Sequence, residues 1–301
     1  MNVLVHGGAG SVSDNSDARQ AVLDEAAAAG GDCDRPATAV VTAVRRLEAD
    51  PRFNAGVGSA VQSDGVIRTD AGLMTGEGQV GAAAAMPGVK HAIDVARAVA
   101  RETPHVLVAG ERAVALAESF GVDTDCTLWT ERTRERWRAA DVPESDSTPD
   151  RLAWVRERFG DDHRPDAGTG SSPPDHDTVG AVATDGRRLA AATSTGGRWF
   201  ALAGRVGDVP QVGAGFYATP GAAVSATGDG EAIARFGLAR RVADAVAAGE
   251  SPQHAADRVL RGFATETGGE AGVIVVDANG QTGTAYNSEA MQTAEPAPEG
   301  I

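Results

Sequence analysis

DHDTVGAVAT, residues 175–184, joins a polar segment to a strand and decides how the chain is organised. Upstream of it, residues 163–174 are rich in Pro, Gly, Ser and Asp and have no apolar period, which predicts a mobile loop. Downstream, short apolar runs on both sides of Asp185-Gly186 predict a β-hairpin. The sequence therefore predicts a flexible segment that runs directly into a strand starting at Thr178.

Composition excludes several classes of partner. The chain has 301 residues, 42% of them hydrophobic, which is enough to bury a large core in one or two domains. It has 42 acidic and 27 basic residues, a formal net charge of -15, and Lys90 as its only lysine. Nucleic acids and anionic membranes would repel such a surface, so we expect neither as a partner. The start of the chain has no basic region followed by a long apolar run, so we expect a cytoplasmic protein without a signal peptide or membrane span.

The order of apolar patterns predicts a layered α+β architecture, in which helices cover the faces of sheets. From about residue 140 to 177 the composition shifts toward Asp, Ser, Pro and Gly, although 150–159 keeps a helical pattern. Because this flexible linker lies inside one globular unit, we expect a single domain over residues 1–301. The predicted helices are 15–29, 35–49, 91–102, 109–119, 230–248 and 252–266. The predicted strands, besides the hairpin after Thr178 and a second hairpin that turns at Asp64-Gly65, are 3–5, 79–86, 105–108, 222–227, 271–277 and 282–287.

Several common kinds of site are not signalled. Cys33 and Cys126 lack C-x-x-C spacing, which favours two small buried hydrophobic residues over a disulfide or a thiolate metal site. None of the glycine-rich loops has the spacing of a phosphate-binding or dinucleotide-binding loop. No histidine lies near a nucleophile elbow or at zinc-ligand spacing, so a Ser-His-Asp hydrolase is not predicted.

A hydroxyl nucleophile without a histidine needs another base. The α-amine of an N-terminal threonine can serve, because its pKa of about 7.7 to 8.0 leaves a useful neutral fraction near pH 7. For Thr178 this requires cleavage of the bond after Asp177. Considered alone, Thr178 reads as an ordinary β-branched strand residue, so the interpretation depends on the motifs around it.

Six motifs, which occur in a fixed order, closely resemble those of the isoaspartyl peptidase and plant-type L-asparaginase family of N-terminal nucleophile hydrolases. The resemblance covers the chain except for a variable linker from about 140 to 174. It implies a four-layer αββα sandwich, made as an inactive precursor that cuts itself into an α chain (1–177) and a β chain (178–301). The two chains would stay together as a dimer of αβ heterodimers. The motifs are HGGAG (6–10), FNAG (53–56), DTVGAVA (177–183), ATSTGG (192–197), GRVGD (204–208) and SATGDGE (225–231).

The resemblance also implies roles for the reacting groups. Thr178 would be the nucleophile, and Thr195 would hydrogen-bond to it and align it. The Thr227 hydroxyl and the Gly228 N–H would form an oxyanion hole, in which each donor would stabilise the negative charge that develops on the attacked carbonyl. Asn54 would support the nucleophile from the α chain.

A second set of residues would bind the substrate. Arg205 would hold an α-carboxylate with its planar guanidinium, and Asp208 would bind an α-ammonium, helped by the Gly228 and Gly230 backbone. Without the family context, Arg205 and Asp208 could equally form a surface ion pair. Together they fit an amino-acid head group, which carries one charge of each sign.

One further loop resembles the family's sodium-binding turn, where mainly backbone carbonyl groups would hold a structural cation. Hard oxygen ligands suit such an ion. No cofactor is expected to be required for the reaction. The matching positions are Leu47, Glu48, Phe53, Ala55 and Val57.

The implied substrates are L-asparagine and β-aspartyl (isoaspartyl) dipeptides, which share an aspartyl head group and differ in the leaving group. One departure weakens this assignment, because Asp229 stands where the family usually has threonine and resembles the related glycosylasparaginases instead. Residues 198–202, RWFAL, are also bulkier than expected and can reshape the leaving-group side. A glycosylasparaginase, a taspase-like endopeptidase and an uncleaved amino-acid-binding relative therefore stay open as alternatives.

The acidic, lysine-poor composition predicts a protein kept soluble in high salt, and so a halophilic source. Salt screens repulsion between like charges over a few Å, whereas at low ionic strength the net charge of -15 opposes compaction. We expect the refolding yield and the melting temperature to be higher in molar KCl than in low salt. Full stability without added salt would contradict this prediction.

Overall fold

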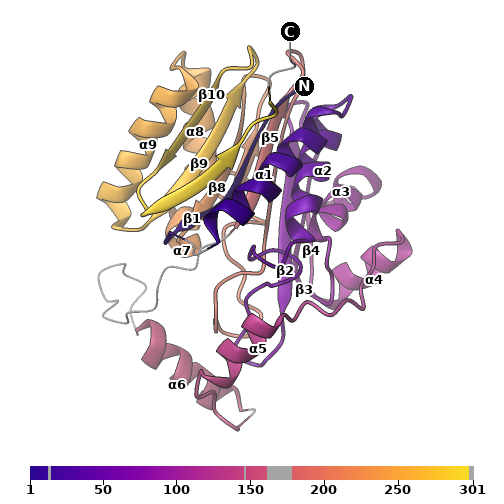
Figure 1. Cartoon of the computed structure of the whole chain (residues 1–301), viewed down its shortest axis with the longest axis vertical. Coiled ribbons are helices and arrows are strands. Elements are labelled where there is room, and N and C mark those ends of the chain that lie inside the picture. The colour runs from indigo at the N-terminus through magenta and orange to yellow at the C-terminus, as the bar shows by residue number, and fades with distance from the viewer. Residues whose placement is uncertain (13–14, 146, 161–177, 298–301) are drawn as a thin grey trace.

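A computed structural model describes residues 1–12, 15–145, 147–160 and 178–297 (Figure 1). The predicted mobile loop at 163–174 and the residue before the predicted cut, Asp177, therefore lie outside the described residues. The elements are β1 (Asn2–Gly10), α1 (Ser16–Gly31), α2 (Pro36–Glu48), β2 (Arg68–Thr75), β3 (Val80–Pro87), α3 (Ala92–Glu102), β4 (Leu107–Ala109), α4 (Glu111–Ser119), α5 (Glu131–Arg138), α6 (Thr148–Phe159), β5 (Val179–Thr184), β6 (Leu189–Thr195), β7 (Phe216–Ala218), β8 (Ala222–Gly228), α7 (Gly230–Phe236), α8 (Leu238–Ala247), α9 (Pro252–Thr267), β9 (Ala271–Asp277), β10 (Thr282–Tyr286) and β11 (Ala290–Ala294).

The strands form two sheets. Seven of them run in the order β11-β1-β5-β6-β2-β3-β4, and four run in the order β10-β9-β8-β7. All neighbouring strands are antiparallel except β3 and β4. The predicted mixture of helices and sheets is thus confirmed, and β5, which follows Thr178, lies inside the larger sheet between β1 and β6.

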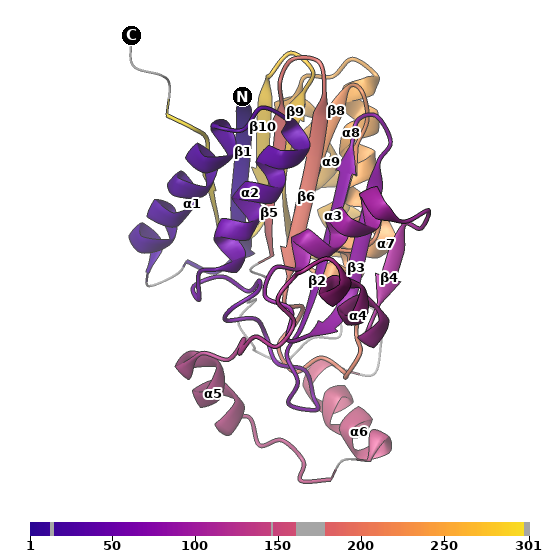
Figure 2. The same ribbon diagram turned by 90° about the vertical axis from the view of Figure 1, so that its right-hand side faces the viewer.

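Helices cover one face of each sheet, and the other two faces pack against each other. Helices α1, α2 and α3 contact the seven-stranded sheet, and α8 and α9 contact the four-stranded sheet (Figures 1 and 2). Side chains alternate between the faces of a strand. In β5, accordingly, Val179 and Ala181 face the helices while Val182 faces the second sheet. Because both faces are covered, β5 and β6 are buried throughout and read as apolar runs.

Two helices lie apart from these layers. In both views α5 and α6 sit below the sheets, on the side where the indigo-to-purple loops gather (Figures 1 and 2). An aromatic cluster attaches them: Trp137 of α5 and Trp154 of α6 pack against Trp199 and Phe200. Among the described residues, none of the helices is both long and apolar enough to cross a membrane.

Two sequence-based expectations are wrong in detail. The strand predicted at 3–5 extends over Asn2–Gly10, so the HGGAG motif lies within β1 and not in a turn after it. The helix predicted at 230–248 is two helices, α7 and α8, because the chain turns at Gly237 with a φ of 70°, which glycine adopts at little cost.

The contact between the two sheets generates a stability prediction. A Cβ on Gly72 would lie 2.0 Å from Cε1 of Phe216, a ring that is fully buried between the sheets. We expect Gly72→Ala to lower the free energy of unfolding by about 1–3 kcal/mol, as overpacked cores do. Gly262→Ala is the control, because nothing lies within 4 Å of a Cβ there and Gly262 is inside α9. It should raise stability by about 0.5–1 kcal/mol. Equal effects in urea unfolding would contradict the prediction.

Candidate active site

The Thr178 hydroxyl is held by the strand pairing. The strand begins at Val179 and not at Thr178 as predicted, and Val179 pairs with Ser194. Continuing that register places Thr178 opposite Thr195, and Thr178 Oγ1 donates to Thr195 Oγ1 at 3.2 Å. Both residues are buried, with 6% and 4% of their surface exposed. Two hydroxyl groups from adjacent strands therefore meet at the end of the sheet.

A loop after β6 fixes Thr195 in turn. The Gly197 N–H donates to Thr195 Oγ1 at 3.0 Å. Asn54 holds this loop, because its Nδ2 donates to the Gly197 carbonyl at 2.6 Å and its Oδ1 accepts from the Ala60 N–H at 2.7 Å. Asn54, which was predicted to support the nucleophile, therefore reaches Thr178 only through Gly197 and Thr195.

A small cavity of about 20 Å³ opens beside these two hydroxyl groups. Such a volume holds about one water molecule. Of the predicted site residues, the threonines at 178 and 195, both charged residues and the glycines at 228 and 230 line it, whereas Asn54 and Thr227 do not. The lining residues are Thr178, Thr195, Gly197, Arg198, Arg205, Gly207, Asp208, Gly228 and Gly230.

The predicted oxyanion-hole residues lie at the end of β8. Thr227 is fully buried, and its Oγ1 accepts a hydrogen bond from the Ala9 N–H at 3.3 Å. Gly228 has a φ of 135°, and a Cβ there would lie 2.3 Å from the Glu270 carbonyl oxygen. Only glycine fits this position, and it is Gly228 that lines the cavity.

Arg205 has a partner that the sequence analysis assigned no role. Its Nε and Nη2 donate to the two carboxylate oxygens of Glu231 at 2.7 and 2.6 Å, a bidentate ion pair. Burial acts to raise the pKa of Glu231, but the charge and hydrogen bonds of Arg205 lower it to about 2. Arg205 and Asp208 thus do not form the surface ion pair that was the alternative. Within the described part of the chain Nη1 makes no hydrogen bond, so this nitrogen is available to a ligand.

Asp208 is a buried carboxylate with an unused acceptor. It is 4% exposed, and its Oδ2 has no hydrogen-bond partner among the described residues. Burial raises the pKa of Asp208 to about 7, with smaller contributions from the negative charges of Glu231 and Asp229, while Arg205 opposes the shift. A cationic group in the cavity would supply both the missing partner and the missing positive charge.

Asp70 is a buried acid that the sequence analysis missed. It pairs with Thr195 in the β2–β6 ladder, and its Oδ1 accepts from the Ala85 N–H at 2.6 Å. Burial raises the pKa of Asp70 to about 6, although that hydrogen bond and Arg205 oppose the shift. A single aspartate in a small-residue strand gives no sequence signal of this position.

His6 lies near Thr178 in a chain of polar side chains. It pairs with Gly180, and its Nε2 is 2.8 Å from Ser225 Oγ, which is 2.8 Å from Thr193 Oγ1. Burial lowers the pKa of His6 to about 3, so the ring is neutral near pH 7. A Cβ on Gly180 would lie 2.4 Å from His6 Nε2, which explains the glycine.

The turn that was predicted to hold sodium follows α2. The Glu48 carbonyl accepts from the Val57 N–H at 3.0 Å, so the turn closes on itself. Unexpectedly, the Glu48 side chain is also used: its carboxylate is fully buried and accepts from Ser194 Oγ at 2.7 Å and from the Ile93 N–H at 3.0 Å. Ser194 precedes Thr195, so this carboxylate ties α2 to the strand that carries the site. Among the described residues, no group of three or more His, Cys, Asp or Glu side chains is placed to hold a metal ion.

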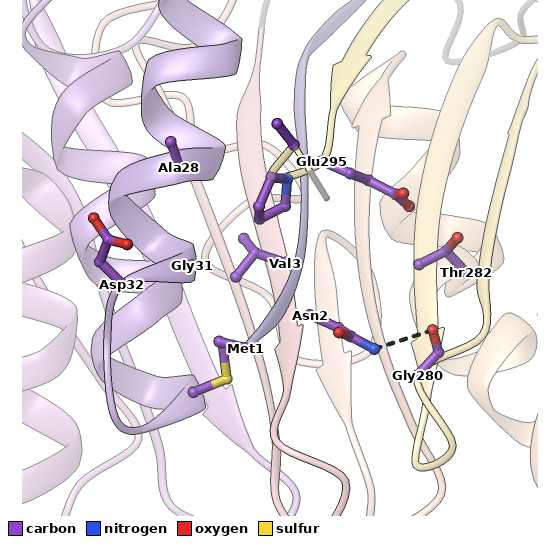
Figure 3. A pocket seen from close by; sticks show the side chains of 11 residues that line it. Met1, Asn2, Val3, Ala28, Gly31, Asp32, Gly280, Thr282 and Glu295 are labelled. Atoms are coloured by element: carbon purple, nitrogen blue, oxygen red, sulfur yellow. Dashed lines mark hydrogen bonds between the residues drawn. The ribbon is translucent and has the colours of Figure 1, made fainter. Parts of the chain in front are cut away.

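A larger cavity, of about 500 Å³, lies elsewhere. Met1, Asn2 and Val3 line it together with the end of α1 and the β9–β10 turn (Figure 3). Asn2 pairs with Thr184, at the opposite end of β5 from Thr178. The volume of a cavity therefore does not mark the candidate site in this protein. The paired hydroxyl groups and the buried charged side chains mark it.

Comparisons with known proteins show which proteins this chain is similar to. A family model described as asparaginase matches residues 1–300. The chain is 40% identical to a plant-type L-asparaginase of Pyrobaculum calidifontis over 306 residues, covering 96% of this chain and 94% of that protein. It is 36% identical to the plant-type L-asparaginase of Pyrococcus abyssi, covering 97% and 95%. It is also 35% identical to an isoaspartyl peptidase/L-asparaginase of Xenopus laevis, covering 97% and 91%.

The unpartnered carboxylate generates a prediction about stability and pH. The Asp208 carboxyl ionises at about pH 4 in the unfolded chain and near pH 7 in the folded one. Because its folded pKa is raised, wild type loses stability as the pH rises through this window. Asp208→Asn removes this titration. The free energy of unfolding of the variant, relative to that of wild type, should therefore rise by about a few kcal/mol between pH 5 and pH 8.

Urea unfolding of wild type and Asp208→Asn at pH 5 and pH 8 measures this difference in the free energy of unfolding. Asp244→Asn is the control, because it removes a carboxylate from the exposed face of α8. A difference between wild type and Asp208→Asn that stays constant with pH would contradict the prediction.

Proposed function

Because this chain belongs to the asparaginase family over residues 1–300, we propose that it hydrolyses the side-chain amide of L-asparagine and the β-linked peptide bond of β-aspartyl dipeptides. The observation that carries this proposal is the hydroxyl pair of Thr178 and Thr195, 3.2 Å apart, in a cavity that Arg205 and Asp208 also line. The same cavity thus contains a hydroxyl group that can act as a nucleophile, a basic side chain and an acidic side chain. The resemblance found in the motifs is confirmed at the level of the family.

The first step of the proposal is activation by self-cleavage. The Thr178 hydroxyl attacks the Asp177 carbonyl, the acyl group moves from nitrogen to oxygen, and water hydrolyses the resulting ester. Thr178 then begins a new chain, and its α-amine is free to act as a base. The burial of Thr178 supports this step, because the attacking residue is shielded from bulk solvent.

Substrate hydrolysis then takes two steps. The α-amine accepts the hydroxyl proton as Thr178 Oγ1 attacks the side-chain carbonyl carbon, and the leaving amine departs with a proton. Water next attacks the β-aspartyl ester, which releases aspartate and restores the hydroxyl. Thr195 aligns the nucleophile, while Thr227 and Gly228 stabilise the negative charge on the attacked oxygen; one such donor is worth about 2.7–4 kcal/mol.

Arg205 and Asp208 recognise the aspartyl head group. The Nη1 of Arg205 donates to the α-carboxylate, because Glu231 already engages Nε and Nη2. Asp208 accepts from the α-ammonium through its unpartnered Oδ2, while its Oδ1 lies next to the Gly230 backbone. The cavity of about 20 Å³ must widen to admit the substrate.

We propose further that the layers form the αββα sandwich of N-terminal nucleophile hydrolases, as one domain over residues 1–301. The chains 1–177 and 178–301 assemble as a dimer of heterodimers in the cytoplasm.

A structural sodium ion at the Leu47–Val57 turn is a separate proposal. Backbone carbonyls of Glu48 and Lys90 converge there, since a Cβ on Gly56 would lie 2.2 and 2.7 Å from their oxygens. Such neutral oxygens fit a hard cation. We expect the melting temperature to rise in sodium chloride relative to tetramethylammonium chloride at equal ionic strength. Equal melting temperatures in the two salts would contradict the proposal.

The resemblance of Asp229 to glycosylasparaginases keeps a second candidate, glycosylasparaginase activity, open. Rates on L-asparagine, β-aspartyl-leucine and a glycosylated asparagine distinguish the candidates. A rate highest on the glycosylated substrate would replace the leading proposal.

The nucleophile assignment gives the sharpest test. Thr178→Ala should stay one chain and lose at least about 1,000-fold in kcat, as removal of a nucleophile does. Wild type should yield fragments that begin at Met1 and Thr178 by intact-mass analysis. Thr184→Ala, at the other end of β5, is the matched control and should still be cut. Ammonia release from asparagine by Thr178→Ala would overturn the assignment.

A further inference from the structure

Arg198 lines the cavity beside Thr178 but has no task in binding the aspartyl head group. That head group carries one positive and one negative charge, which Asp208 and Arg205 already match. Within the described residues, no hydrogen bond or ion pair engages the Arg198 guanidinium, which instead lies over the ring of Phe159, 4.3 Å from its centroid. Contact with the face of a ring leaves the N–H donors, which lie in the plane of the guanidinium, available to an anion.

The backbone around Arg198 is fixed on both sides. Gly197, before it, is bound by Thr195 and Asn54. After it, Trp199 and Phe200 are buried in the aromatic cluster, and the Phe200 N–H donates to the Val61 carbonyl at 2.7 Å. Phe159 is the last residue of α6, so α6 supports the side chain while the loop supports the backbone. Arg198 is therefore held at the cavity wall by two separate elements.

The positive charge of Arg198 would distinguish the two proposed substrates by their leaving groups. Asparagine loses ammonia, which has no negative charge, whereas a β-aspartyl dipeptide loses an amino acid whose α-carboxylate is free. Resting on the proposed function, we propose that Arg198 binds the carboxylate of the leaving amino acid and so favours β-aspartyl dipeptides with a free C-terminus. The nearby Glu231 is the other anion that Arg198 could serve, but both of its oxygens are already engaged by Arg205.

The test compares three probes: β-aspartyl-leucine, β-aspartyl-leucinamide, which lacks the carboxylate, and L-asparagine. Wild type should cleave the acid about 10- to 100-fold more efficiently than the amide, measured as kcat/KM, because one charge-assisted contact is lost. Arg198→Met should reduce this ratio to nearly one, and Arg198→Lys should restore part of it. The asparagine value should fall by less than about threefold in Arg198→Met, since ammonia makes no such contact.

Arg187→Met is the matched control, because Arg187 lies in the exposed β5–β6 turn, and its acid-to-amide ratio should equal that of wild type. Equal rates on acid and amide in wild type would overturn the inference, and so would a uniform loss on all three probes in Arg198→Met. Intact-mass analysis checks that each variant is still cut. If wild type hydrolyses neither asparagine nor either dipeptide, the proposed function itself fails, which is a separate outcome.

Discussion

Val179 pairs with Ser194 across the antiparallel β5–β6 ladder, and this register fixes where Thr178 and Thr195 meet. The neighbouring ladders extend the same constraint: Asp70 pairs with Thr195, and His6 with Gly180. Because side chains alternate along a strand, a slip of one residue would turn Thr195 toward the other face. The Glu48 carboxylate, bound to Ser194, secures β6 from the helix layer. The meeting of the two hydroxyl groups therefore depends on sheet pairing.

The buried charges at this site are balanced only in part. Glu231 engages Arg205 through hydrogen bonds, and Asp208 and Asp70 interact with it through their charges, so one guanidinium serves three acids. Burial raises the pKa of Asp208, Arg205 opposes the shift, and the charges of Glu231 and Asp229 add smaller increases. An environment of this kind is unfavourable for the empty protein and favourable for a ligand that brings an ammonium group. The same buried carboxylates that make the empty folded protein less stable would therefore bind the ammonium group of a ligand.

Much of this could be predicted from the sequence, because glycine-rich motifs occupy positions where neighbouring atoms leave no room for a Cβ, such as Gly180 and Gly228. Long amphipathic helices were found to within a few residues. What escaped prediction depends on tertiary contacts: β7 has three residues, β11 gains its strand form by pairing with β1, and α5 is held by aromatic packing. The pairing of Arg205 with Glu231 escaped for the same reason, since 26 residues separate them and no periodicity connects them.

The strand order of the larger sheet has a consequence for a chain that is cut before Thr178, as proposed. Strands β1, β2, β3 and β4 precede the cut, whereas β5, β6 and β11 follow it, and β1 lies between β11 and β5. The two pieces are thus woven into one sheet and cannot part without breaking ladders on both sides of β1. Once they do part, reassembly becomes a second-order reaction whose half-time grows with dilution, while the uncut precursor folds as a single molecule at any concentration. Because folding comes first and cutting second, the two chains of the mature protein are already paired in one sheet and separate only slowly.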